Sequence, residues 1–215
     1  MSSKTNTVYK NNQTNDYNDV VIQGRITHIM SRPSLVVLTI CTGRATKEMS
    51  YVRAVCYGDA MKQALSFKKD DRVRVTGNIQ SSIRNTKIEN QQTLSVFAES
   101  VSEPLTAFSE RFEDASTVEG DFVESKNEFR VSGTVVNVAP SKSGNSLYLT
   151  VRSIKNGRLS FVKITYYPKD KENVEEIKRG TKVCSYGWIR AKNEKNESGK
   201  FLYKHYFIAL EVHTA

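Results

Sequence analysis

The chain has 215 residues, of which 38% are hydrophobic and 26% charged, and its formal net charge is +9. This composition predicts one large or two small globular domains and excludes a wholly disordered chain. The sequence contains no run of roughly 18 apolar residues that would span a membrane, and its first twenty residues do not resemble a secretory signal. We therefore expect a cytoplasmic protein without a membrane partner, and the positive charge favours a polyanionic partner such as nucleic acid.

The three cysteines, Cys41, Cys56 and Cys184, lack CxxC spacing, and the three histidines lie far from any cluster of metal ligands. We expect free thiols, no metal site and no cofactor. The sequence also lacks the GxxxxGK[ST], HExxH and GxSxG motifs, which argues against an enzyme.

Residues 1–18 are rich in Asn, Thr, Ser and Lys without periodicity, which predicts a mobile N-terminal tail. Residues 19–102 form the first predicted domain, in which turn residues separate five β-branched, apolar runs. A short amphipathic helix is expected at Asp59–Phe67, between the third and fourth runs. The runs are Val20–Met30, Leu35–Thr42, Ser50–Tyr57, Arg72–Ser82 and Thr93–Val101. The resulting β-β-β-α-β-β order is that of an OB-fold, so the predicted fold class is all-β with short helices.

Residues 103–127 break this pattern and carry seven acidic and two basic residues, which indicates an acidic linker and leaves a charge of +14 on the rest. Residues 128–215, the second predicted domain, repeat the first, with a second helix expected at Lys169–Lys178. The predicted strands are Glu128–Val138, Ser146–Ser153, Leu159–Tyr167, Thr181–Lys192 and Phe201–Val212.

Glycines inside the strands support the duplication. Gly24 and Gly133 lie in the two first strands, and Gly77 and Gly187 lie in the two fourth strands, with almost the same spacing between the members of each pair. A glycine inside a strand is typical of a bulge or sharp bend, which a small barrel needs where a strand turns a corner. The sequence thus predicts two tandem OB-fold β-barrels.

The stretch VRAVCYGDAMKQALSFKKDDRVRVTGNI, residues 52–79, resembles the third strand, helix and fourth strand of bacterial single-stranded DNA-binding proteins, the SSB family. The aromatic-Gly pair Tyr57-Gly58, the run Lys68–Val73 and the strand glycine Gly77 carry the resemblance, which is fainter in the second domain. It implies sequence-tolerant binding and protection of single-stranded DNA during replication, recombination or transfer of DNA.

Two features depart from that family. Bacterial SSBs usually carry one OB-fold per chain, tetramerise and end in an acidic tail with a terminal Phe, whereas this chain has two predicted folds and ends in EVHTA. The tandem arrangement is more similar to phage, plasmid or other mobile-element binders, or to the tandem folds of eukaryotic replication protein A, and a homo-oligomer stays open. An RNA-binding OB protein is the first alternative, because the same groove holds either kind of strand. The second is an interaction module of a replication, recombination or transfer complex, docked through the acidic linker.

Strands two and three of an OB-fold form the usual oligonucleotide groove. Because side chains alternate along a strand, both third strands should expose an aromatic residue, a cation and a tyrosine, an order that suits base stacking beside phosphates. The alternative is packing of these rings under a loop or at a dimer interface. The two sets, related by the same spacing as Gly77 and Gly187, are Tyr51, Arg53 and Tyr57, and Phe161, Lys163 and Tyr167.

The same alternation adds further candidates from neighbouring strands and loops. Trp188 either stacks on a base or packs against the linker, and the sequence favours neither. The first domain has Val37 and Cys41 where the second has Tyr148 and Arg152, which predicts stronger binding by the second. The added strand candidates are Tyr148, Arg152, Trp188 and Arg190, and the loop cations are Arg44, Lys47, Arg84, Lys87, Lys142, Lys155, Arg158 and Lys192.

Overall fold

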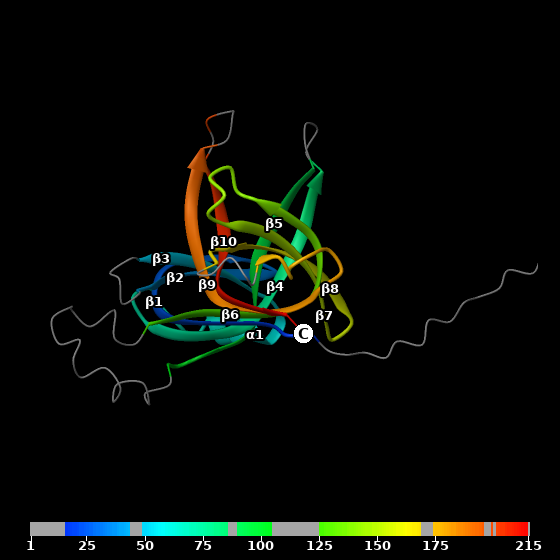
Figure 1. Cartoon of the computed structure of the whole chain (residues 1–215). Helices are drawn as coiled ribbons and strands as arrows, with labels where there is room; N and C mark the ends of the chain where they lie inside the picture. Colours follow the sequence, from blue (N-terminus) through cyan, green and yellow to red (C-terminus); the bar gives the residue numbers. More distant parts are fainter. Residues whose placement is uncertain are drawn as a thin grey trace, which may run out of the picture.

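The computed structural model describes residues 16–43, 49–85, 90–104, 125–168, 174–195, 199 and 201–214. Within these residues the chain forms ten strands and one short helix, which confirms the all-β fold class with a short helix (Figure 1). The elements are β1 (Asn18–Arg32), β2 (Leu35–Thr42), β3 (Ser50–Cys56), α1 (Gly58–Ala64), β4 (Arg72–Asn85), β5 (Asn90–Ser102), β6 (Lys126–Pro140), β7 (Leu147–Lys155), β8 (Arg158–Tyr166), β9 (Lys182–Lys195) and β10 (Phe201–Thr214).

The strands close into two circuits with the same pairing. In the first circuit, β1 pairs with β2 and β4, β2 with β3, and β5 with β4, all antiparallel, while β3 and β5 pair in parallel. In the second circuit, β6, β7, β8, β9 and β10 repeat each of these pairings in the same order. The hairpins β4–β5 and β9–β10 extend beyond the circuits as two arms (Figure 1).

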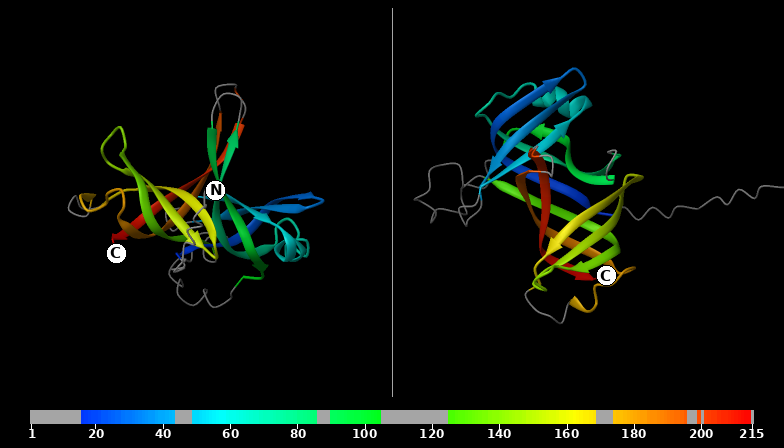
Figure 2. Two further views of the ribbon diagram at one scale, coloured as in Figure 1. Left: turned by 90° about the vertical axis from the view of Figure 1, so that its right-hand side faces the viewer. Right: turned by 90° about the horizontal axis from the view of Figure 1, so that it is seen from above.

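One antiparallel pairing joins the two circuits. Strands β1 and β6 run side by side, with Val20 opposite Phe129 and Ile22 opposite Asn127, so the two circuits share a continuous sheet (Figure 2). The core residues Val20 and Phe129 are nearly inaccessible, at 1% and 2% exposed. The division into domains at residues 19–102 and 128–215 stays a prediction.

The strand glycines lie where a neighbouring backbone approaches closely. A Cβ on Gly24 would lie 2.1 Å from the carbonyl oxygen of Cys41, and one on Gly133 would lie 2.2 Å from that of Arg152. The same contact recurs at Gly77 and Gly187, at 2.0 and 1.9 Å. A bulge interrupts the register close to each glycine, as the predicted bends require.

Two buried asparagines hold the strands together near the junction. The side chain of Asn18 accepts from the N–H of Ile79 at 2.9 Å and donates to its carbonyl at 2.8 Å. Asn127 makes the same pair of bonds with Ile189, at 2.9 and 2.8 Å, and also donates to Thr42 of the first circuit at 3.0 Å. Each amide thereby bonds a buried backbone N–H and a buried backbone carbonyl, as buried polar groups require.

The structure differs from the sequence expectations at several element ends. Residues 16–18 do not belong to a tail, because β1 begins at Asn18 and the N–H of Tyr17 donates to Ser132 of β6 at 2.7 Å. Strand β6 begins at Lys126, inside the expected linker. Of the helix expected at Lys169–Lys178, the described part has a single turn, which packs Val174 and Ile177 on the core. Residues 1–15 and 105–124 lie outside the described residues.

Among the described residues, no helix is long and apolar enough to cross a membrane. Over the same ranges there is no group of three or more His, Cys, Asp or Glu side chains that would hold a metal ion. All three cysteines are thiols rather than halves of a disulfide, and burial raises the pKa of Cys56 to about 12, as expected for a thiol packed in an apolar core.

Candidate nucleic-acid interface

The first candidate row lies along β3. Val52, Ala54 and Cys56 point into the core and are fully buried, so the residues between them face outward. Tyr51 is 46% exposed and Tyr57, which follows the strand, is 45% exposed. We call Tyr51, Arg53 and Tyr57 the first row.

The second row, Phe161, Lys163 and Tyr167, occupies the equivalent places along β8. Phe161 and Tyr167 are 36% and 53% exposed, and Lys163 between them is also exposed. The alternation that placed both rows on an outward face is therefore observed. Their role in binding stays a prediction.

Strand β7 widens the second row into a surface. Tyr148 is 51% exposed, and the exposed Arg152 lies directly opposite Phe161 in the β7–β8 pairing. Thr150 and Lys163 are likewise opposite one another. Rings and cations thus alternate across two neighbouring strands, an arrangement that can stack bases and hold phosphates at the same time.

The matching surface beside the first row is poorer in rings and cations. On β2, Val37 lies opposite Val55, and Cys41 lies opposite Tyr51 with only 5% of its area exposed. The first surface therefore offers a cation only on β3, at Arg53, within the described parts of these two strands.

Arg53 is held by residues of the second circuit. Its guanidinium carbon lies 4.0 Å from the ring centroid of Tyr203 on β10, a cation–π contact. Its backbone N–H donates to the hydroxyl of Tyr203 at 3.0 Å and to Nε2 of His205 at 3.2 Å. The Tyr203 hydroxyl in turn donates to the carbonyl of Tyr51, so β10 covers the edge of β3.

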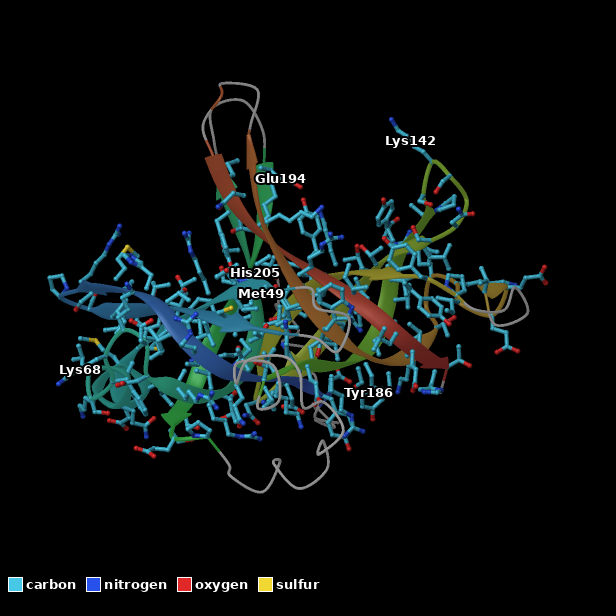
Figure 3. The ribbon with its side chains drawn as sticks, turned by 90° about the vertical axis from the view of Figure 1, so that its left-hand side faces the viewer. Met49, Lys68, Lys142, Tyr186, Glu194 and His205 are labelled. Atoms are coloured by element: carbon cyan, nitrogen blue, oxygen red, sulfur yellow. The ribbon has the colours of Figure 1, made fainter. Side chains whose placement is uncertain are left out.

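His205 takes part in this contact in its neutral form. Its Nδ1 lies 3.3 Å from the carbonyl oxygen of Leu94 on β5, and because a carbonyl only accepts, Nδ1 carries the proton and Nε2 is an acceptor. Burial lowers the pKa of His205 to about 4, and the charge of Arg53 acts in the same direction. Figure 3 labels His205 at the base of the arm that carries Glu194.

Tyr57 has a ring partner within its own circuit. Its ring stacks on Phe97 of β5, with centroids 5.8 Å apart and planes 13° apart. One face of Tyr57 is therefore covered, and the other remains accessible to a base.

Two sequence-predicted site residues offer little free surface to a ligand. Trp188 is only 8% exposed although alternation placed it on the outward side of β9, which favours packing over stacking, and its role stays a prediction. Lys155 is also not a free loop cation. Its Nζ lies 2.7 Å from Asp19 and 3.2 Å from Glu99, which ties the β7–β8 hairpin to the first circuit.

The remaining predicted cations are spread over several places. Arg190 is exposed on β9, as alternation predicted. Lys192 and Arg84 were expected in loops but lie within β9 and β4, and Lys192 is exposed. Lys142 is exposed in the turn between β6 and β7, where Figure 3 shows it at the tip of a projecting loop. Arg158 is exposed beside the tight Asn156-Gly157 turn, whose two positive φ angles are 51° and 75°. Arg44, Lys47 and Lys87 lie outside the described residues.

Sequence reasoning missed two groups near these surfaces. Alternation alone did not assign a face to Tyr203 and His205, because nearly every residue of β10 around them is aromatic or basic. The strand register in the structure decides on which face of β10 they lie. The second group is a cation–π cluster, in which the guanidinium of Arg130 lies 3.3 Å from the ring of Tyr17 and 5.2 Å from that of Tyr186. No sequence signal links these three residues.

The geometry defines an OB-type fold with outward aromatic and basic rows. No protein-family model matches the chain, and no curated protein matches its sequence. Among solved structures, the wild-type single-stranded DNA binding protein from Thermus aquaticus is similar, with a TM-score of 0.64, 15% identity and 94% of each chain covered. A deletion mutant of that protein matches with a TM-score of 0.63 and 14% identity, over 94% of this chain and 96% of the mutant's chain. At such identity the likeness establishes the fold.

Proposed function

We propose that this chain binds single-stranded DNA without catalysis, through two OB-type units that act in series. The units are residues 19–102 and 128–215, joined by the acidic segment 103–127. The β2–β3 surface of the first unit and the β7–β8 surface of the second are the binding faces.

One observation carries the proposal: the same row occurs twice. An exposed ring, an exposed cation and an exposed tyrosine recur in the same order on strands that occupy equivalent places in the two circuits. Exposed rings are costly on a surface unless something covers them, and bases stack on rings whatever their sequence, at about 1–3 kcal/mol per base. The fold of the Thermus protein adds support by analogy alone.

The charge distribution supports a polyanionic ligand. The chain carries +9 overall although its acidic segment carries −5, so the rest of the chain is strongly basic. Each phosphate neutralised by a lysine or arginine releases counterions, which makes binding steeply salt-dependent. At about 4–16 nucleotides per OB-fold, one chain would cover a few tens of nucleotides at most.

The biological setting we propose is protection of single strands during replication, recombination or transfer of DNA, in a phage, plasmid or other mobile element. Coating a strand removes hairpins and blocks nucleases without any chemical step. Replication or transfer proteins that dock on the acidic segment, and self-association of the chain, belong to the same proposal.

The test is fluorescence anisotropy with labelled oligo(dT) of about 30 nucleotides, beside a matched duplex and a matched RNA, at low and high salt. We expect tight binding to oligo(dT) that weakens steeply with salt, and much weaker binding to duplex. Equal or tighter binding to RNA would replace the DNA proposal by an RNA one. Weak binding to all three at low salt would contradict both and leave protein docking as the function.

A further inference from the structure

We infer that the two rows bind a strand unequally and in order: the β7–β8 surface takes the strand first, and the β2–β3 surface follows only after Arg53 leaves Tyr203. This inference rests on the proposed single-strand binding and assigns how that same site works.

In the first row, Arg53 is already in contact with residues of β10. The guanidinium of Arg53 lies over the Tyr203 ring at 4.0 Å, and the backbone of Arg53 is bonded to Tyr203 and His205. A phosphate that approaches Arg53 must therefore compete with the ring for the cation. A base that approaches Tyr57 finds one of its faces already stacked on Phe97.

The cation of the second row, Lys163, has no ring partner among the residues that the structure describes. By the strand register, the counterparts of Tyr203 and His205 are Gln92 and Leu94, which have no ring to hold a cation. The arm of the first circuit does contact the second row, since the N–H of Phe161 donates to the Ser81 hydroxyl at 3.0 Å, but serine has no ring either. Lys163 is exposed, and neither counterpart on β5 can cover it as Tyr203 covers Arg53.

The second surface also carries more groups that suit a strand. Tyr148 and Arg152 stand where the first surface has Val37 and the buried Cys41. The unrestrained Lys163 and the added Tyr148 and Arg152 both place the stronger site on β7–β8.

The consequence is a dependence on oligonucleotide length. A strand long enough for one OB-fold occupies the β7–β8 surface alone. A longer strand reaches the first row, where the local concentration of phosphate is high enough to draw Arg53 away from Tyr203. Tyr203 and Arg53 thus set the order in which the two surfaces fill.

The matched variants Tyr57→Ala and Tyr167→Ala test this inference, because these exposed tyrosines follow β3 and β8 at equivalent places. Titrations use oligo(dT) of about 12 nucleotides, near one footprint, and of about 35 nucleotides. With the short oligonucleotide we expect Tyr167→Ala to weaken the tighter site by about tenfold or more, and Tyr57→Ala to change it by less than about twofold. With the long one, both variants should weaken binding.

Equal losses for the two variants on the short oligonucleotide, or a larger loss for Tyr57→Ala, would overturn the order. Failure of the unmodified protein to bind either oligonucleotide would contradict the proposed function instead, so the two failures are distinguishable.

A second variant tests the cause. Tyr203→Leu removes the ring over Arg53 and the hydroxyl bond, whereas Tyr203→Phe keeps the ring. At the weaker site, we expect a second molecule of the short oligonucleotide to bind Tyr203→Leu about tenfold more tightly than the unmodified protein. At the same site, Tyr203→Phe should bind as weakly as the unmodified protein. An unchanged second site in a Tyr203→Leu chain that melts cooperatively would contradict the role of Tyr203. If that variant does not fold, the tyrosine pair above decides alone.

Discussion

Acidification should weaken the fold through His205, which the structure holds as a partly buried, neutral imidazole between Leu94 and Arg53. Its pKa is about 4 in the folded chain and about 6.5 when unfolded, so the unfolded chain takes up a proton first as the pH falls. The stabilisation is fully present above pH ~6.5 and is lost between that pH and about 4. Linkage gives a loss of roughly 2 kcal/mol between pH 7 and pH 5, out of about 3 kcal/mol in all.

The assay is urea unfolding at several values between pH 7 and pH 5, with His205→Gln as the matched control. Glutamine keeps a hydrogen-bonding side chain but does not titrate, so carboxylates and the other histidines contribute equally to both chains. We expect the free energy of unfolding of the unmodified chain to fall by roughly 2 kcal/mol more than that of the variant. Parallel pH dependences, within about 0.5 kcal/mol, would refute the partly buried, neutral histidine.

Three further predictions concern the fold. Gly24→Ala would force a Cβ to within 2.1 Å of the Cys41 carbonyl oxygen, so we expect a loss of roughly 2–4 kcal/mol in thermal unfolding, and a loss below about 0.5 kcal/mol would contradict the close approach. Asn127→Ala leaves the N–H of Ile189 buried without its partner, while the Ile189 carbonyl keeps only the bond from the Ser50 hydroxyl, so the change should cost about 1–3 kcal/mol, whereas Asn137→Ala, on the exposed side of β6, should cost little. Trp188, at 8% exposed, should emit at short wavelength, resist acrylamide and change little on adding oligo(dT); strong quenching by either would show that it is accessible.

The strand pattern and the strand glycines could be predicted from the sequence because both depend on residues within a single strand. Alternation of apolar residues fixes which side of a strand faces the core, as it does for Val52 and Ala54, and a mid-strand glycine marks a bend whatever the partner strand is. The same reasoning found both rows, because each lies within one strand and its immediate end.

Contacts between the two circuits could not be predicted from the sequence. Arg53 and Tyr203 are 150 residues apart, and Lys155 and Asp19 are 136 apart, so no periodicity relates them. Alternation assigns Trp188 to the outward side of β9 but cannot tell what covers that side. Charge alone likewise placed Lys155 among the binding cations, although its carboxylate partners lie on β1 and β5.

The most direct test of the binding faces is photocrosslinking to an oligo(dT) in which 5-iododeoxyuridine replaces some thymidines, followed by mass spectrometry of the linked peptides. The halogenated base links to an aromatic side chain only when the two are in contact. The account predicts crosslinks at Tyr148, Phe161 and Tyr167, and at Tyr57 with longer strands. Crosslinks confined to Tyr17 and Tyr186, in the Arg130 cluster, would contradict it.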